Sequence, residues 1–496
     1  MDDFTLAPEP RPDRGRGRAL LIALVAVALF VGAVFAYRAM LTDPDDAAAR
    51  ARAEAGADSG KLPSIVVIVT DDQRWDTLDA MPIVQSELAD HGVTFRNGFV
   101  VNSACCPSRA SILTGKYSHS TGVYTNTGSE GGFRSFNDGS TMATWLDVDY
   151  ESALIGKYLN NYEFAGKNGQ VPLGWDHWVA FPKAAYGDFA LNIDGKVERF
   201  GGHQGSSTSV LADQAVRFIE GTDGPLLLYF APKAPHWPAE PEPRDADEFS
   251  HIAKHRPRSF NEADVSDKPD WVQRKDLLTS AQVKAMDRFR RGQLQTLLPV
   301  DRAVGDVVAA LDDTGRLGNT MIVFLSDNGM LWGEHRLRGK GNAYEESIRV
   351  PFIVRYDAGV ADPGSASDEL VLNIDIAPTA AALGGVNAPR AEGKSLLPLL
   401  LDPDASWRED FLVEHFSPGG PSGNPPVFCA VRSERYKLVD YYWGRDELYD
   451  LNSDPYELEN RIFDPALAAE RNHLQAREKE LCNPPPPRKL SYWDQR

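Results

Sequence analysis

Short, fully apolar runs recur along the chain and predict buried β-strands. They lie at residues 65–69 (IVVIV), 226–230 (LLLYF), 321–325 (MIVFL) and 352–354 (FIV). Between them, residues 207–220 and 294–311 carry apolar side chains at helical spacing. Strands without polar alternation are buried on both faces, so this order of elements predicts an α/β fold with a doubly wound, mostly parallel sheet.

The pattern changes near Gly384 and Gly385, where the alternation of strands and helices ends. Tyr-rich runs at 436–442 and 447–451 then predict a small C-terminal antiparallel subdomain, closed by a helix near 467–481. The Pro-, Asp-, His- and Arg-rich stretch 235–275 predicts a long ordered loop over the sheet.

The N-terminal region predicts a membrane anchor. Residues 19–37 are apolar and uncharged, and about 19 helical residues span roughly 28 Å, close to the bilayer core. Arg11, Arg14, Arg16 and Arg18 precede the run, which favours a single-pass cell-membrane protein with its body outside the cytoplasm. The alternative is a cleaved signal peptide and a secreted protein.

These patterns divide the chain into five expected parts. They are a cytoplasmic tail (1–18), a transmembrane signal-anchor (19–37), a linker (38–62), a catalytic domain (63–385) and a C-terminal subdomain with tail (386–496).

Charge and cysteine content narrow the function. The 496 residues include 52 Lys and Arg against 71 Asp and Glu, a net charge of −19. This balance argues against nucleic acid as a partner and requires any anionic substrate to bind in a locally positive pocket. Four cysteines in this length exclude a disulfide-built scaffold.

The most informative stretch is residues 105–116 (CCPSRASILTGK). Pro107 suits the first position of a helix and Gly115 its C-cap, which puts Cys105 at or just before the helix N-terminus. Arg109 follows one turn later, so a group at position 105 faces an anion site, where a thiolate would have a lowered pKa. The alternative is a buried structural cysteine pair.

Two expected strands are followed by polar residues, Asp71-Asp72 and Asp327-Asn328. Open α/β sheets bind ligands at the carboxyl edge of their strands. Since these four side chains offer only oxygen ligands, they suit a hard cation such as Ca²⁺ or Mg²⁺.

With its Cys-x-Pro-Ser-Arg and Leu-Thr-Gly signature, the chain resembles the formylglycine-dependent, arylsulfatase-like sulfatase family. Further motifs agree with that family in order: Asp71-Asp72, Gly156-Lys157-Tyr158, Pro235-His236-x-Pro238, Ser326-Asp327-Asn328-Gly329, Gly339-Lys340, Arg349-Val350-Pro351 and Asp375-x-x-Pro378-Thr379. The resemblance implies an alkaline-phosphatase-like fold and an enzyme that cleaves sulfate monoesters.

The resemblance also implies the roles of the site residues. Cys105 would be converted to formylglycine (3-oxoalanine) by a formylglycine-generating enzyme, and its hydrated aldehyde would attack sulfur. The implied ligands of Ca²⁺, with Mg²⁺ as the other possible ion, are Asp71, Asp72, Cys105, Asp327 and Asn328. Arg109, Lys157 and Lys340 would hold the sulfate, and His236 would protonate the leaving alcohol.

One position departs from many sulfatases, which carry a His where this chain has Leu159. The run Gly156-Lys157-Tyr158-Leu159-Asn160 and His119 instead resemble the N-acetylglucosamine-6-sulfatase branch, so a sulfated carbohydrate is the expected substrate. His119 or Asn160 is expected to replace the missing polar contact. The alternatives are a phosphonate or phosphate ester hydrolase of this fold and an unmodified glycan-binding relative.

The two remaining cysteines, Cys429 and Cys482, are expected to form a disulfide. Both belong to the part expected outside the cytoplasm, and Cys105 and Cys106 are adjacent in the active-site signature.

Overall fold

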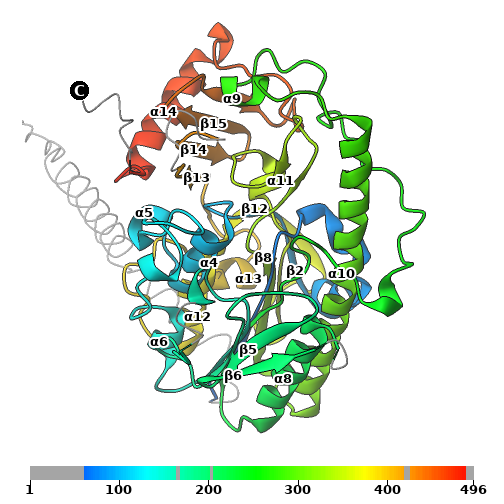
Figure 1. Ribbon diagram of the computed structural model, residues 1–496. Helices are drawn as coiled ribbons and strands as arrows, with labels where there is room; N and C mark the ends of the chain where they lie inside the picture. The colour runs from blue at the N-terminus through cyan, green and yellow to red at the C-terminus, as the bar shows by residue number, and fades with distance from the viewer. Residues whose placement is uncertain (1–60, 164–167, 202–204, 418–424, 488–496) are drawn as a thin grey trace, which may run out of the picture. The chain divides into compact units, whose positions relative to one another are not determined.

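A ten-stranded sheet forms the centre of the main body (Figure 1). The computed structural model describes residues 61–163, 168–201, 205–417 and 425–487. In spatial order the strands are β12 (Ser365–Leu372), β2 (Gly92–Phe99), β11 (Phe352–Tyr356), β8 (Thr320–Ser326), β1 (Ser64–Thr70), β7 (Leu226–Ala231), β3 (Glu151–Gly156), β4 (His177–Ala180), β5 (Phe189–Ile193) and β6 (Lys196–Phe200).

The strands of the centre, β8, β1, β7, β3 and β4, are parallel neighbours, which confirms the predicted mostly parallel sheet. The run at 352–354 lies in β11, which pairs antiparallel with both β8 and β2. An antiparallel neighbour needs no crossover helix, and the only helix between β8 and β11 is the single turn α11 (Glu345–Ile348).

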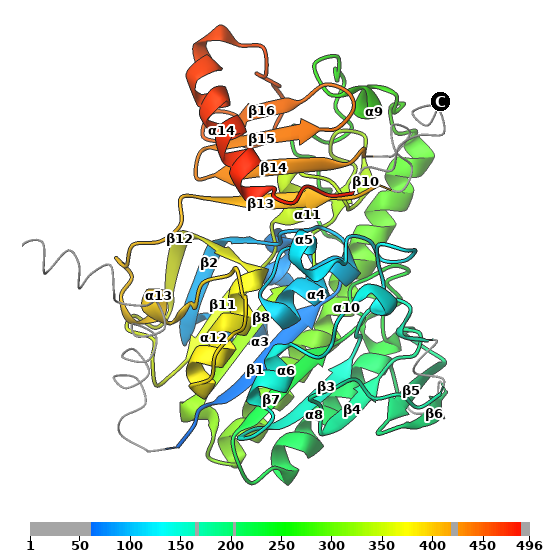
Figure 2. The ribbon, with the colours of Figure 1, turned by 90° about the vertical axis from the view of Figure 1, so that its left-hand side faces the viewer.

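Helices cover both faces of the sheet (Figure 2). On one face, Ile65, Val67 and Val69 of β1 pack in a core with α4 (Cys105–Thr114), α6 (Met142–Leu146), α12 (Ile376–Gly384) and α13 (Leu397–Leu401). On the other face, Val66 and Ile68 pack with α8 (Ser207–Gly221) and α10 (Ser280–Asp313). This burial on both sides explains why β1 carries no polar alternation.

The expected helix at 294–311 is the C-terminal half of α10, which begins at Ser280. A capping box between Thr279 and Gln282 satisfies backbone donors at that start. The predicted loop 235–275 is largely irregular and holds only the short α9 (Asp270–Gln273) and a 3₁₀ turn at Pro243–Asp245.

The C-terminal part contains a four-stranded antiparallel sheet, as expected. It comprises β13 (Asp410–His415), β14 (Phe428–Ser433), β15 (Tyr436–Tyr441) and β16 (Glu447–Asp450). Helix α14 (Ala468–Leu481) packs on one face through Leu474, against Val431 and Leu438. The other face shares a core with β2, β12 and α11, so the small sheet is joined to the main body by apolar packing.

The remaining elements of the described residues are short. They are α3 (Pro82–Val84), α5 (Ser118–Thr121), β9 (Leu331–Trp332), β10 (Arg338–Gly339), a π-helical turn at Gln85–Ala89 and 3₁₀ turns at Trp75–Ala80, Phe133–Ser135, Leu317–Asn319, Asn373–Asp375 and Pro465–Leu467.

The expectation of a single-pass membrane protein is corrected. In the part of the chain that the structure describes, no helix combines the length and the apolar character needed to cross a bilayer. The run 19–37, on which that expectation was based, lies outside the described residues.

The expected disulfide is confirmed: Cys429 of β14 is bonded to Cys482, directly after α14, with their Cα atoms 6.3 Å apart. Replacing both cysteines with Ala should lower the free energy of unfolding by about 2–4 kcal/mol, because the unfolded chain regains a long open loop. Urea unfolding of the oxidised protein and the double variant measures this difference. Equal stabilities, or two free thiols found by non-reducing peptide mapping, would contradict it.

Candidate active site

The register of two central strands brings the polar residues at their ends together. Thr70, the last residue of β1, pairs with Ser326, the last residue of β8, in a parallel ladder. Asp71 and Asp327 therefore leave the sheet side by side, and the Asp72 backbone N–H donates to Asp327 Oδ1 at 3.1 Å. Asp72 adopts a left-handed conformation (φ 68°), which is uncommon outside glycine but which Asp tolerates better than most residues.

Helix α4 presents Cys105 to this edge of the sheet. The helix begins at Cys105, two residues earlier than Pro107 suggested, and Pro107 is tolerated because first-turn N–H groups need no helical partner. Gly115 ends the helix with φ 68°, as predicted. At the start of α4 the Cys106 N–H donates to Asn126 Oδ1 at 2.9 Å, and the side chain of Cys105 lies at the strand ends, beside Asp71.

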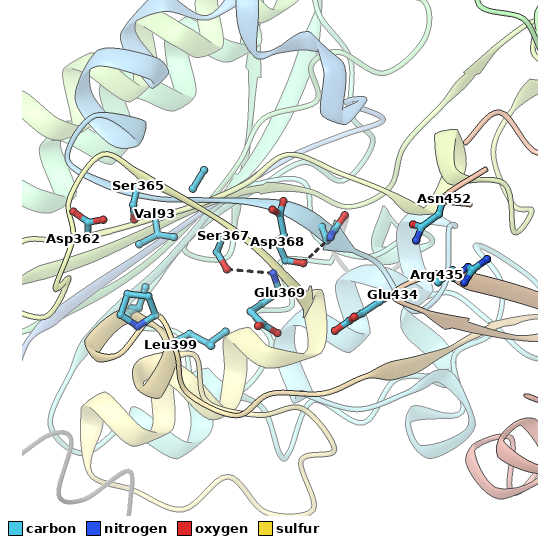
Figure 3. A pocket seen from close by; sticks show the side chains of 14 residues that line it. Val93, Asp362, Ser365, Ser367, Asp368, Glu369, Leu399, Glu434, Arg435 and Asn452 are labelled. Carbon is cyan, nitrogen blue, oxygen red and sulfur yellow. Dashed lines mark hydrogen bonds between the residues drawn. The ribbon is translucent and has the colours of Figure 1, made fainter. Parts of the chain in front are cut away.

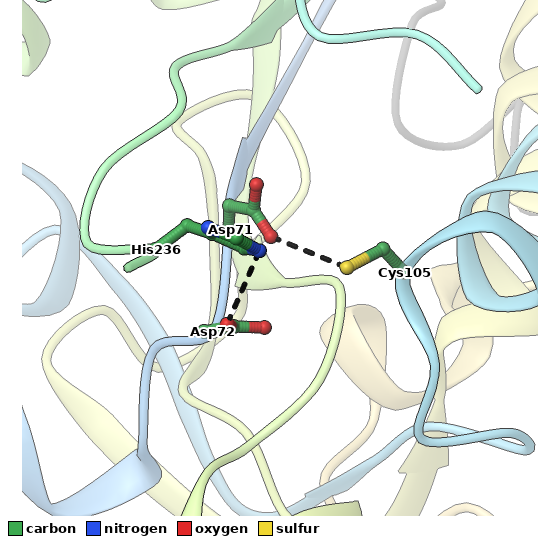
Figure 4. Close-up of side chains that lie close together, drawn as sticks. All are labelled: Asp71, Asp72, Cys105 and His236. Atoms are coloured by element: carbon green, nitrogen blue, oxygen red, sulfur yellow. Dashed lines mark hydrogen bonds and ion pairs between the residues drawn. The ribbon is translucent and has the colours of Figure 1, made fainter. Parts of the chain in front are cut away.

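Four side chains converge at this point (Figure 4). Asp71, Asp72, Cys105 and His236 each place one potential ligand atom within 4.8 Å of the others. Cys105 Sγ lies 3.4 Å from Asp71 Oδ1, and His236 Nε2 lies 3.8 Å from Asp72 Oδ2. Asp71 and Asp72 directly follow β1, His236 lies in the loop after β7, and Cys105 begins α4.

Three cations surround the cluster. Lys157, directly after β3, donates to Asp71 Oδ2 at 2.6 Å. Lys340 contacts both Asp72 and Cys105, with its Nζ 2.6 Å from the sulfur. Arg109 Nε donates to Asp327 Oδ2 at 2.8 Å and is almost fully buried. The site is thus buried, and its carboxylates are paired with three surrounding cations.

The pKa values of Asp71 and Asp327, the aspartates that follow β1 and β8, are shifted in opposite directions. Burial alone would raise the pKa of Asp71, yet the surrounding cations, Lys157 above all, hold that pKa well below its usual value. Burial and the Asp71 charge raise the pKa of Asp327. Carboxylates this close together are costly to ionise without further positive charge.

The pKa of the Cys105 thiol is shifted in the direction opposite to the one expected. Burial raises its pKa to about 12, more than Lys157 and Lys340 lower it, so the anticipated lowering by the helix terminus is wrong. The neighbouring Cys106 is also fully buried, and burial raises its pKa to about 12. A buried thiol of this kind is a poor nucleophile at neutral pH.

The donor set at the site suits a hard divalent cation. Asn328 is fully buried, and its Oδ1 has no hydrogen-bond partner, while its Nδ2 donates to Asp72 Oδ1 at 2.8 Å. An unsatisfied buried acceptor beside three carboxylates is what an oxygen-ligated ion would complete. The residues present therefore fit a bound divalent cation, with Asp71, Asp72, Asp327 and Asn328 as its oxygen donors.

A cavity of about 250 Å³ opens directly onto the cluster. Asp71, Lys157, Lys233 and His236 line it, together with Asn160 from the loop after β3. A larger cavity of about 520 Å³ lies elsewhere, beside the edge strand β12 (Figure 3). Its walls carry Asp362, Asp368, Glu369 and Glu434 against a single cation, Arg435, so their net negative charge does not suit an anion.

Two residues at the site escaped the sequence analysis. The buried Lys233 lies 3.2 Å from His236 Nδ1 and donates to the Trp237 carbonyl at 2.8 Å. Gln293 of α10 reaches from the opposite layer to the carbonyls of Asp72 and Pro235. The place of Lys233, three residues before His236, was a usable signal, whereas nothing in the sequence marks Gln293.

The structure does not bring His119 to this cluster, which corrects its expected contact with Cys105. Its Nδ1 lies 3.2 Å from Glu414, and its Nε2 lies 3.4 Å from Glu392. Burial alone would lower the pKa of His119, but hydrogen bonds to these carboxylates outweigh it and raise the pKa to about 10. His119 therefore ties α5 to the C-terminal part of the chain.

Comparison with known proteins gives consistent matches. The Sulfatase family model matches residues 63–386, and the model of the N-sulphoglucosamine sulphohydrolase C-terminal region matches residues 333–483. The chain is 32% identical over 485 residues to N-acetylglucosamine-6-sulfatase of Capra hircus, covering 86% of each chain.

Solved structures share the fold. One, described in complex with its substrate D-glucosamine-2-N,6-O-disulfate, has a TM-score of 0.74 and 26% identity, covering 85% of this chain and 98% of its own. A phosphonate monoester hydrolase of Agrobacterium radiobacter has a TM-score of 0.66 and 21% identity, covering 85% and 96%, and at that identity shows likeness of fold alone.

The pairing of His119 makes stability depend on pH. Since its pKa is raised from 6.5 to about 10, the stabilisation is complete below pH 6.5 and is lost as pH rises toward 10. His119→Gln should cost about 2 kcal/mol at pH 6, and less at each higher pH. Urea unfolding between pH 6 and pH 10 measures the difference.

The matched control is His177→Gln, which removes a half-exposed pair with Glu151 and should change stability little at any pH. A His119→Gln cost that stays constant across the pH range would contradict the assigned charge pairing.

Proposed function

The chain belongs to the sulfatase family, and on this premise we propose that it hydrolyses sulfate monoesters of carbohydrates. The proposed reaction uses a modified Cys105 and a divalent cation. The observation that carries the proposal is the position of Cys105, at a helix N-terminus among Asp71, Lys157 and Lys340.

The proposed cation ligands are Asp71, Asp72, Asp327 and Asn328, with the group at position 105 completing the set. When bound, Ca²⁺ or Mg²⁺ would neutralise these carboxylates and act as a Lewis acid on the sulfate. Lys157 and Lys340 would then no longer have to neutralise Asp71 and Asp72. Both ammonium groups could instead face an anionic ester. Arg109 would stay engaged with Asp327 and hold it in place.

The unmodified thiol fits this role poorly. Its raised pKa keeps it protonated, and a thiol that attacked sulfur would have no second group with which to expel sulfate. Conversion of Cys105 to formylglycine would supply a geminal diol, in which one hydroxyl attacks sulfur and the other expels sulfate. The proposed role of the protein around it is to orient this diol through Asp71 and Lys340.

His236 is the proposed proton donor to the leaving alcohol. It lines the cavity that opens onto the cluster, and its Nε2 is directed to Asp72 at the reaction centre. Lys233 and the Trp237 carbonyl lie against Nδ1, on the far side of the ring, and would fix its orientation. Carbohydrate sulfates have poor leaving groups, so they depend on this proton more than aryl sulfates do.

A carbohydrate substrate is supported by the N-acetylglucosamine-6-sulfatase relative and by the glucosamine disulfate complex. The competing activity is hydrolysis of phosphonate or phosphate esters, since the same cations would bind either anion. Rates on matched aryl sulfate and aryl phosphonate esters distinguish them, and a preference for the phosphonate would overturn the proposal.

Cys105→Ala should lower sulfate-ester turnover by at least about 1000-fold, because the nucleophile is removed. Cys106→Ala is the matched control. It removes an adjacent buried thiol that packs in the apolar core with Ala110, so it should keep most of the activity and cost about 1 kcal/mol of stability. Steady-state kinetics on both purified variants measure this. Comparable activities of the two variants would refute a nucleophile at position 105.

Removal of divalent metal should inactivate the enzyme more than about 100-fold, because Lewis-acid stabilisation of several kcal/mol is lost. Added Ca²⁺ should restore activity and raise the thermal midpoint. Asp72→Asn should abolish that rise, whereas the exposed control Asp368→Asn should preserve it. Full activity in protein shown to be metal-free by elemental analysis would contradict the assigned ion site.

A further inference from the structure

A second cavity continues from the first beyond His236. It measures about 410 Å³ and shares Ala184, Lys233 and His236 with the 250 Å³ cavity at the reaction centre. Its remaining walls come from the loop after β4 and the loop after β7, both at the carboxyl edge of the sheet. A ligand with its sulfate ester at Lys157 therefore has a continuous path past His236 into this second space.

One side of the second cavity is the indole ring of Trp237. This side chain is 67% exposed, although leaving a large aromatic ring in water is unfavourable. Its backbone is held in place, because the Trp237 carbonyl accepts from Lys233 at 2.8 Å and the His236 carbonyl accepts from Tyr186 Oη at 2.7 Å. The ring is thus an exposed aromatic surface on a fixed segment, directly beside the proposed proton donor.

The two cavities share Lys233 but differ in their other charged groups. The first adds Lys157 and Lys183, as an anionic group requires, together with Asp71 and Glu163. The second adds only the exposed carboxylates of Asp188 and Glu240, which disfavour a second sulfate and accept hydrogen bonds from hydroxyl or amide N–H groups. A flat aromatic face with such acceptors suits a pyranose ring, whose C–H face packs on the indole while its hydroxyls point to the carboxylates.

We propose that Trp237, with Asp188 and Glu240, forms a subsite for an uncharged sugar residue linked to the sulfated one, so that the substrate is an oligosaccharide. This inference rests on the proposed function for its reacting end, but the binding of the neutral sugar is independent of catalysis. Other occupants, such as an aromatic aglycone or a sulfated peptide, do not need the hydroxyl acceptors.

The subsite is tested by the ratio of kcat/KM for an extended substrate to kcat/KM for the monosaccharide. For the wild type, kcat/KM should be about tenfold higher for 6-sulfated N-acetylglucosamine extended by a neutral hexose, at one of its two ends, than for the monosaccharide. Trp237→Ala should remove this advantage, and Trp237→Tyr should restore most of it. Phe463→Ala, which removes a similarly exposed ring outside the lining of both cavities, should leave the ratio unchanged.

A binding measurement separates this inference from the proposed function. Unsulfated di- and trisaccharides of the same sequence should give saturation-transfer signals with the wild type, and these signals should be lost in Trp237→Ala. If the glycans bind in this way but no sulfate ester is hydrolysed, the proposed function fails and the subsite stands. A wild-type ratio near one, equal losses on mono- and oligosaccharide, or a preference for aryl sulfates that depends on Trp237 would overturn the subsite.

Discussion

The site depends on the pairing of β1 with β8, because that register decides which charges share one buried space. With Thr70 opposite Ser326, both strands deliver their aspartates to the same point, and a shift of one residue would turn alternate side chains to the other face. Asp71, Asp72 and Asp327 are then all buried, and Arg109, Lys157 and Lys340 compensate them. Carboxylates in this setting are stable only with partners, so the cations and the expected metal ion follow from the strand register.

The elements that deliver those partners are held by apolar packing on both faces of the sheet. Helix α4 is buried along its whole length, which fixes Cys105 against the strand ends. On the opposite face α10 packs beneath the sheet and sends Gln293 up to the Asp72 carbonyl. Rigid elements in both layers thus define the position of each charged group, and the loops after β4 and β7 add the cavity walls.

The sequence predicted the features that are encoded locally. Apolar runs identify β1, β7 and β8 because those strands are buried on both faces, and Gly115 identifies a helix end because its backbone is left-handed. The orientation of β11 could not be predicted, since an apolar run carries no sign of strand direction. His119 was misplaced for a similar reason: its partners Glu392 and Glu414 lie far along the chain, and only the tertiary fold brings them near. The pKa of Cys105 depends on burial, which outweighs the helix terminus that the local pattern revealed.

The proposed requirement for a modified residue at position 105 is tested by mass spectrometry and kinetics on the same protein samples. Protein is produced with different amounts of formylglycine-generating enzyme, and the fraction of the Cys105 peptide in which sulfur is replaced by the aldehyde oxygen is determined. Sulfatase activity per mole of protein should rise in proportion to this fraction and extrapolate to zero when every Cys105 retains its thiol. Full activity in protein whose Cys105 peptide carries only the unmodified thiol would contradict it.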